Sequence, residues 1–174
     1  MELDFEIDKI TESIENAQTG ETFDTLVLPL AKTDLEQVTR KNGWLFDWKQ
    51  EISEPEKQVY KLITEQEPQT IQGLVSFENK KDHVFMYLIE SSPCNIGKGK
   101  QYLGVCGNLT AFGCKMSKDY GFDGVIVFEP KTALIPHYEK TLGAVLIGER
   151  RMAIFEKDAQ VLLDKYFPSM EEEL

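Results

Sequence analysis

The feature that most constrains the fold is a pair of apolar segments in the middle of the chain, joined by a short polar link. Segments 71–78 (IQGLVSFE) and 83–91 (HVFMYLIES) are rich in β-branched and aromatic residues, and the polar residues NKKD connect them at 79–82. Two such runs with a short polar connection are typical of an antiparallel β-hairpin. The sequence therefore predicts a β-sheet at the centre of the fold.

A helix and further strands are predicted around this hairpin. Val105, Leu109, Phe112 and Met116 recur at spacings of three and four residues, which is typical of a helix packed on a sheet. The run 124–128 (GVIVF) is apolar throughout, as in a strand covered on both faces. The mixture of elements indicates an α/β (α+β) fold. Further strands are expected at 25–30, 44–48, 59–64, 145–147 and 151–155, and further helices at 132–142, with Thr132 as the N-cap, and at 158–167.

Length and composition indicate one domain. The 174 residues correspond to about one domain of ordinary size, and 41% hydrophobic with 28% charged residues are typical of globular proteins. Ile7, Ile10 and Ile14 stand at helical spacing among acidic residues, so a short amphipathic helix or an arm is predicted at 1–22. Residues 23–170 are expected to form the single domain, and 171–174 an acidic tail.

The charge balance argues against a nucleic-acid partner. The chain has 19 Lys and Arg against 30 Asp and Glu, a net charge of -11, whereas nucleic-acid binding needs clustered basic residues. An acidic protein favours a cationic partner, or its charge serves solubility alone. No segment reaches the roughly 18 apolar residues that span a bilayer, and the N-terminus lacks a signal-peptide pattern. We therefore expect a cytoplasmic protein that binds neither membrane nor nucleic acid.

The cysteines predict free thiols rather than a metal site. Cys94, Cys106 and Cys114 form no CxxC pair, and His83 and His137 are the two histidines that could join them. This spacing does not match a zinc site, and no metal is expected. Buried thiols are the favoured interpretation of Cys106 and Cys114.

Segment 95–109 (NIGKGKQYLGVCGNL) combines glycines with the start of the predicted helix. A helix start presents unpaired N–H groups and the positive end of the helix dipole, so it binds anions such as phosphate. Tight packing is the alternative use of such glycines. The segment lacks the ending of a Walker loop, and it follows a hairpin, which disfavours a Rossmann dinucleotide site.

Two motifs resemble those of the GNAT acetyltransferase family. Gln101, Gly104, Cys106 and Leu109 match the family's acyl-CoA pyrophosphate loop Q/R-x-x-G-x-G/A-x-x-L, with Cys106 where Gly or Ala is usual. Segment 137–144 (HYEKTLGA) resembles the family's tyrosine-bearing Y-E-K-x-G-F segment near the C-terminus. The chain is therefore similar to this family over its central and C-terminal parts.

The resemblance, which extends over residues 71–155, implies a fold and a cosubstrate. The family has a mixed, mostly antiparallel sheet that is splayed at its middle strands and flanked by helices, with a cleft between strands 83–91 and 124–128. Acetyl-CoA would bind in this cleft. The residues implied to contact it are Ile89, Glu90 and Ser91 on the strand edge, Gln101, Tyr102, Leu103, Gly104, Val105, Cys106 and Gly107 in the loop, and Lys131, which stands where the family often has asparagine.

The resemblance also implies two catalytic residues. Tyr138 matches the family's general acid, a phenol near the CoA sulfur, and the alternative for this side chain is packing in the core. Glu90 is the candidate for the general base, and the alternative is an exposed position on a strand. The helix end differs from the family's, because one more residue separates Tyr138 from Gly143.

The function that the resemblance implies is N-acetyl transfer from acetyl-CoA to a primary amine of a small molecule or a protein. Direct attack by the amine in a ternary complex is the expected mechanism, with a preference for cationic acceptors. A catalytically inactive binding module on the same fold is the alternative. A homodimer formed through the C-terminal edge of the sheet is compatible with both.

Overall fold

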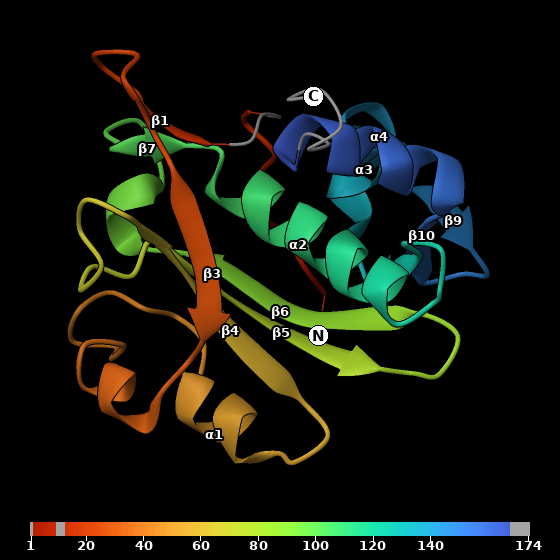
Figure 1. Cartoon of the computed structure of the whole chain (residues 1–174), viewed down its shortest axis with the longest axis horizontal. Helices are drawn as coiled ribbons and strands as arrows, with labels where there is room; N and C mark the ends of the chain where they lie inside the picture. The colour runs from red at the N-terminus through yellow and green to blue at the C-terminus, as the bar shows by residue number, and fades with distance from the viewer. Residues whose placement is uncertain (1, 10–12, 168–174) are drawn as a thin grey trace, which may run out of the picture.

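The computed structural model of the chain, which describes residues 2–9 and 13–167, is built on one mixed β-sheet with helices packed against it (Figure 1). The seven strands lie in the order β3-β4-β5-β6-β8-β10-β9. Neighbours are antiparallel except β6 and β8, which are parallel. The predicted mixed and mostly antiparallel sheet is thus confirmed. Its strands are β3 (Thr25–Pro29), β4 (Gln58–Thr64), β5 (Gly73–Asn79), β6 (Val84–Ser91), β8 (Ile126–Phe128), β9 (Val145–Ile147) and β10 (Arg151–Ile154).

Helix α2 (Val105–Asp119) lies across β5 and β6, and α4 (Glu156–Tyr166) packs against α2 (Figure 1). The predicted stripe explains this placement, since Val105, Leu109 and Met116 are buried and Phe112 packs against the same core. The other helices are α1 (Trp48–Ser53) and α3 (Ile135–Leu142), with 3-10 turns at Lys32–Glu36, Pro93–Asn95 and Thr132–Leu134.

Two local predictions need correction. Residues 44–48 do not form a strand, because the Asp47 side chain accepts a hydrogen bond from the backbone N–H of Gln50 at 3.0 Å and caps helix α1 at Trp48. The helix expected from Thr132 begins as a 3-10 turn, and α3 itself starts at Ile135. Proline is accepted in a first helical turn, which agrees with this later start.

The N-terminal segment is extended. No helix forms in residues 2–9 or 13–22, the part of the predicted helix or arm that the structure describes, while Ile10 and the tail 171–174 lie outside the described residues. Leu3, Phe5 and Ile7 are buried, and the acidic residues between them are exposed. This period of two is the signature of an extended chain with one buried face. Residues 2–9 are called the N-terminal arm below.

A second, smaller sheet joins the segment after the arm to the glycine-rich segment. Its order is β2 (Thr22–Phe23), β1 (Ile14–Asn16), β7 (Tyr102–Leu103), with antiparallel pairing. One residue, Gly104, separates its strand β7 from the start of helix α2. The N-terminal part of the chain therefore lies beside the predicted pyrophosphate loop.

Candidate active site

The main sheet opens between β6 and β8. The two strands pair at Val84–Ile126, Phe85–Val127 and Met86–Phe128, after which β8 ends while β6 continues to Ser91. The predicted splay of the middle strands is therefore present. It lies beside the N-terminus of α2, because Cys106 in the first turn of that helix has its Sγ 3.3 Å from the Oγ of Ser91 at the end of β6.

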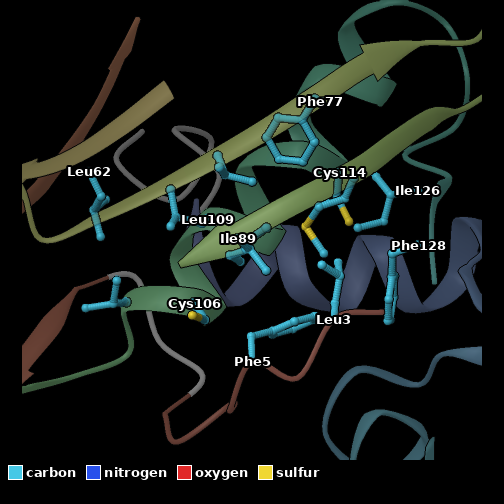
Figure 2. Packing of buried hydrophobic residues seen from close by; sticks show 14 of the residues in the cluster. Leu3, Phe5, Leu62, Phe77, Ile89, Cys106, Leu109, Cys114, Ile126 and Phe128 are labelled. Carbon is cyan, nitrogen blue, oxygen red and sulfur yellow. The ribbon is translucent and has the colours of Figure 1, made fainter. Parts of the chain in front are cut away.

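The N-terminal arm occupies this opening. Leu3 forms a parallel bridge with Pro130: its N–H donates to the carbonyl of Glu129 at 2.8 Å, and its carbonyl accepts from the N–H of Lys131 at 2.7 Å. The arm thus runs alongside the extension of β8. Figure 2 shows the side chains of Leu3 and Phe5 in a row between Cys106 of α2 and Phe128 of β8.

Aromatic packing holds the arm against α3. The Phe5 ring stacks on the Tyr138 ring with centroids 4.5 Å apart and meets the Phe128 ring edge-on at 5.6 Å. Such pairs contribute about 0.5–1.5 kcal/mol beyond the burial of their surface. The N–H of Ile7 donates to Nε2 of His137 at 3.0 Å, so the neutral ring nitrogen of that histidine is the acceptor here.

The glycine-rich segment is anchored on the sheet by Asn95. The side-chain amide of this buried residue donates to the carbonyl of Gln72 at 3.2 Å, and its Oδ1 accepts from the N–H of Tyr102 at 3.1 Å. The N–H of Gln101 donates to the carbonyl of Cys94 at 2.8 Å. The backbone of the predicted pyrophosphate loop is therefore fixed before helix α2 begins.

A carboxylate already occupies the start of α2. The N–H of Gly104, the N-cap residue, donates to Oδ1 of Asp8 at 2.7 Å, and Lys100 Nζ lies 3.0 Å from Asp8 Oδ2 and 3.3 Å from Glu6 Oε2. Burial lowers the pKa of Lys100, but its hydrogen bonds to Asp8 and Glu6 and their charges outweigh this and raise it overall. Gly104 has a φ of 95°, which disfavours a side chain at this position. The helix start therefore contacts an anionic group, and this group belongs to the arm. Binding of a pyrophosphate at this loop stays a prediction.

The chain also passes directly over the first turn of α2. A Cβ at Gly107 would meet the Tyr166 hydroxyl and lie 2.8 Å from the carbonyl of Lys9. The Tyr166 hydroxyl donates to that same carbonyl at 2.6 Å.

Cys106, in the same first turn of α2, is buried. Its Sγ lies 3.3 Å from Ser91 Oγ, and burial raises the pKa of this thiol to about 12. The predictions that Cys106 and Cys114 are buried free thiols are confirmed.

Glu90 is buried at the end of β6, with an exposed fraction of 5%. Its carboxylate accepts hydrogen bonds from the N–H groups of Leu45 at 2.7 Å and Phe46 at 3.3 Å, and from Trp48 Nε1 at 2.7 Å. The alternative of an exposed strand position is therefore wrong. Sequence reasoning missed these three donors, although the run WLFDW before the Asp47 cap was the signal that could have pointed to them.

Tyr138 is fully buried, and its hydroxyl faces the arm. The hydroxyl donates to the carbonyl of Phe5 at 2.7 Å and lies 3.4 Å from that of Leu3. Burial, followed by the neighbouring Cys106 and Asp4, raises the pKa of this phenol, so it stays protonated. Lys131 has an exposed side chain, and its backbone N–H holds Leu3.

A cavity of about 260 Å3 remains between the arm and β6. Ligand pockets usually measure roughly 300–1,000 Å3, so the arm leaves little room. Four acidic residues and one basic residue are among those that line it: Asp4, Glu6, Asp8, Glu90 and Lys100. The cavity brings together six of the predicted site residues: Ile89, Glu90, Ser91, Tyr102, Val105 and Cys106. Four others belong to the loop and helix start beside it: Gln101, Leu103, Gly104 and Gly107. The remaining two, Lys131 and Tyr138, contact the arm.

The split sheet with a helix start at its opening is the fold of the GNAT acetyltransferases. A nourseothricin acetyltransferase matches with a TM-score of 0.53 and 12% identity over 75% of this chain and 97% of its own. A chimera of the spermidine N-acetyltransferase SpeG from Vibrio cholerae with hSSAT matches with a TM-score of 0.54 and 14% identity over 79% and 98%. FeeM, an N-acyl amino acid synthase from uncultured soil microbes, matches with a TM-score of 0.53 and 10% identity over 81% and 96%.

Sequence comparisons add no family assignment, since no family model and no curated protein sequence matches the chain. Within residues 2–9 and 13–167, no helix is long and apolar enough to cross a membrane. The same described residues hold no group of three or more His, Cys, Asp or Glu side chains placed to bind a metal ion.

Proposed function

We propose that the protein is an N-acetyltransferase that transfers the acetyl group of acetyl-CoA to a primary amine. The observation that carries this proposal is the meeting of the β6–β8 split with an anion-binding helix start, where the Asp8 carboxylate lies on the Gly104 N–H and Lys100. A carboxylate at this point supports a site for the larger anionic group of a nucleotide, because the same N–H groups and dipole attract both. The similarity of fold to known acetyltransferases supports it further.

The cosubstrate would bind along the split. The loop from Gln101 to Gly107 would hold its pyrophosphate through backbone N–H groups, with Lys100 as the nearby positive charge and Lys131 as a second one. The β6 edge at Ile89, Glu90 and Ser91 would pair with its extended pantetheine arm, in the way that a peptide adds to an open sheet edge. When bound, acetyl-CoA supplies the activated thioester carbonyl.

Glu90 and Tyr138 would move the protons. Glu90 would take the proton of the incoming ammonium through water, which frees the nitrogen lone pair to attack the carbonyl carbon. As the C–N bond forms and the C–S bond breaks, Tyr138 would donate its phenol proton to the departing thiolate. The nitrogen loses its second proton as the amide forms, and this proton would restore the Tyr138 phenol through water, while Glu90 releases its proton to solvent. The products are the N-acetyl amine, the free thiol and one proton.

The cavity supports a cationic acceptor. Its lining residues include four acidic residues and one basic residue, and the whole chain has a net charge of -11. Both attract a positively charged amine and raise its local concentration. One matched structure is described as a spermidine N-acetyltransferase, and spermidine is such an amine.

Calorimetric titration with acetyl-CoA tests the proposal, using the full chain and the variants Gly104→Glu and Gly104→Ala. Both variants place a Cβ at a left-handed residue, 3.2 Å from the carbonyl of Ser13, so they share the backbone strain. The glutamate alone adds a negative charge at the proposed pyrophosphate site. We expect binding to be lost in Gly104→Glu and weakened much less in Gly104→Ala, whereas equal affinities would contradict the site.

A non-catalytic binding module is the second candidate. It is favoured by the internal partners of the two proposed catalytic groups, since the Glu90 carboxylate accepts from three donors of its own chain and Tyr138 donates to the arm. Such a module would bind a ligand in the cleft without turnover. Amine-dependent release of the free thiol separates the two candidates.

A further inference from the structure

The N-terminal arm makes the kinds of contact that the proposed cosubstrate would make. Asp8 places a negative charge at the start of α2, and Leu3 and Phe5 fill the split with apolar groups. The backbone of Leu3 hydrogen-bonds to the chain just beyond the end of β8. We propose that the arm is an internal ligand of the cleft, which acetyl-CoA must displace in order to bind; this inference rests on the proposed function.

The anion contacts cannot serve the arm and the cosubstrate together. The Gly104 N–H has its hydrogen directed at Asp8 Oδ1 at 2.7 Å, and Lys100 pairs with both Asp8 and Glu6. A phosphate group in the same place would meet two carboxylates, and like charges at short distance repel. Binding of the pyrophosphate therefore requires Asp8 to leave.

Tyr138 leads to the same conclusion at the other end of the arm. Its hydroxyl donates to the Phe5 carbonyl at 2.7 Å, and the Phe5 ring covers its ring face. A hydroxyl has one proton to donate, so Tyr138 can reach a sulfur in the cleft after the arm has left. The seated arm thus blocks both cosubstrate binding and the proposed acid.

The arm can leave without breaking the main sheet. It joins the sheet through the isolated bridge Leu3–Pro130, while the seven strands pair with one another. Its outer face is polar, because Glu2, Asp4 and Glu6 are exposed. Displacement therefore costs the burial of Leu3, Phe5 and Ile7 together with the arm's hydrogen bonds and its ion pairs with Lys100. A large anionic ligand in the same cleft would offset this cost through its own contacts.

The test compares acetyl-CoA affinity in full-length variants by calorimetry. Asp8→Ala removes the contact with Gly104 and Lys100, and Phe5→Ala removes the stack on Tyr138. Glu2→Ala is the control, because it removes an exposed arm carboxylate. If the arm is seated in about nine of ten molecules, its release lowers the apparent Kd about tenfold.

Hydrogen exchange of the peptide that covers residues 2–9 is measured on the same samples, with and without acetyl-CoA. We expect tighter binding in Asp8→Ala and Phe5→Ala than in the wild type and Glu2→Ala, and faster exchange of the arm when acetyl-CoA is added to the wild type. Asp8→Ala and Phe5→Ala remove different contacts of the arm. If one of them fails to fold, the other still tests the inference.

Two other results would overturn the inference in distinguishable ways. If acetyl-CoA binds all four proteins equally and the arm keeps its protection, the cosubstrate does not compete with the arm. The inference then fails, while the proposed function is unaffected. If exchange shows a released arm in the variants but none of the four binds acetyl-CoA, both the inference and the proposed function fail.

Discussion

Tyr138 has a structural contact now and a proposed chemical role once the arm leaves. In Tyr138→Phe the Phe5 carbonyl loses its donor, so we expect the free energy of unfolding to fall by about 1 kcal/mol. If the phenol is the general acid, kcat falls about 100-fold or more. Acetyl-CoA affinity should be unchanged or higher, because the arm is held less strongly.

The matched control for this change is Tyr60→Phe, which removes a hydroxyl that donates to Gln58 at 2.9 Å on β4. Denaturant unfolding and steady-state kinetics on both variants separate the structural effect from the chemical one. An unaltered kcat in Tyr138→Phe would exclude the phenol as the acid.

Glu90 should contribute strongly to stability. In Glu90→Gln the side chain keeps one acceptor oxygen and turns an NH2 group toward N–H donors, so three hydrogen bonds cannot all persist. We expect a loss of about 2 kcal/mol of unfolding free energy, since hydrogen bonds to a charged group are the stronger ones. Glu65→Gln, at an exposed position, is the control in urea unfolding. Equal midpoints for the two variants would show that the three donors contribute little.

The thiols should differ sharply in reactivity. Burial raises the pKa of Cys106 and of Cys114 to about 12, whereas Cys94 is exposed. At pH 8 we therefore expect iodoacetamide to modify Cys94 in the native protein and all three cysteines after unfolding, as read by peptide mass spectrometry. Rapid modification of Cys114 in the native protein would contradict its burial.

The buried thiols also make stability depend on pH. Because unfolded thiols ionise near pH 9 and the buried ones near 12, the free energy of unfolding should fall as pH rises through this window.

Among the elements, α3 contacts the arm through the Tyr138 side chain and also through a hydrogen bond that His137 accepts. His137→Leu removes the nitrogen that accepts from Ile7, while His137→Gln keeps an acceptor oxygen at a similar reach. We expect faster hydrogen exchange in residues 2–9 in the leucine variant and near-normal exchange in the glutamine variant. If both variants exchange alike, this hydrogen bond does not hold the arm.

The elements that the sequence predicts well are those whose patterns depend on local spacing. The central hairpin, the stripe of Val105 and Leu109 on α2 and the apolar strand β8 all appear as expected. The strand predicted at 44–48 was wrong, because the alternating aromatic residues there resemble a strand while Asp47 caps helix α1. The Asp47 cap therefore decided the local structure, against the strand that the alternation over residues 44–48 predicts.

The arm shows why the site was harder to predict than the fold. The alternation of Leu3, Phe5 and Ile7 with acidic residues was visible in the sequence, but the competing spacing of Ile7, Ile10 and Ile14 suggested a helix. Nothing local indicates that Asp8 contacts Gly104, since the two are 96 residues apart in sequence. Contacts of this kind depend on the assembled sheet, so the loop motif was predictable and its internal ligand was not.

At the scale of the whole molecule, the structure combines an acidic surface with an acidic cleft. The net charge of -11 and the four acidic residues that line the cavity act in the same direction on an incoming ligand. They attract a polyamine and repel a nucleotide, except at the helix start, where N–H groups and Lys100 reverse the local field. Under the proposed function, the two ends of the cleft would therefore attract different ligands, the amine at one end and the anionic part of acetyl-CoA at the other.

If this cleft catalyses acetyl transfer to an amine, as proposed, the acetylated amine can be detected as a product. The most direct measurement is mass spectrometry of the amines after incubation of the full chain with acetyl-CoA and a panel containing a polyamine, a neutral amine and an amino acid. Asp8→Ala is run in parallel so that the seated arm does not conceal activity. We expect an acetylated polyamine, formed faster by Asp8→Ala and far more slowly by Tyr138→Phe. Bound acetyl-CoA with no acetylated amine from either the wild type or Asp8→Ala would contradict it and identify the protein as a binding module.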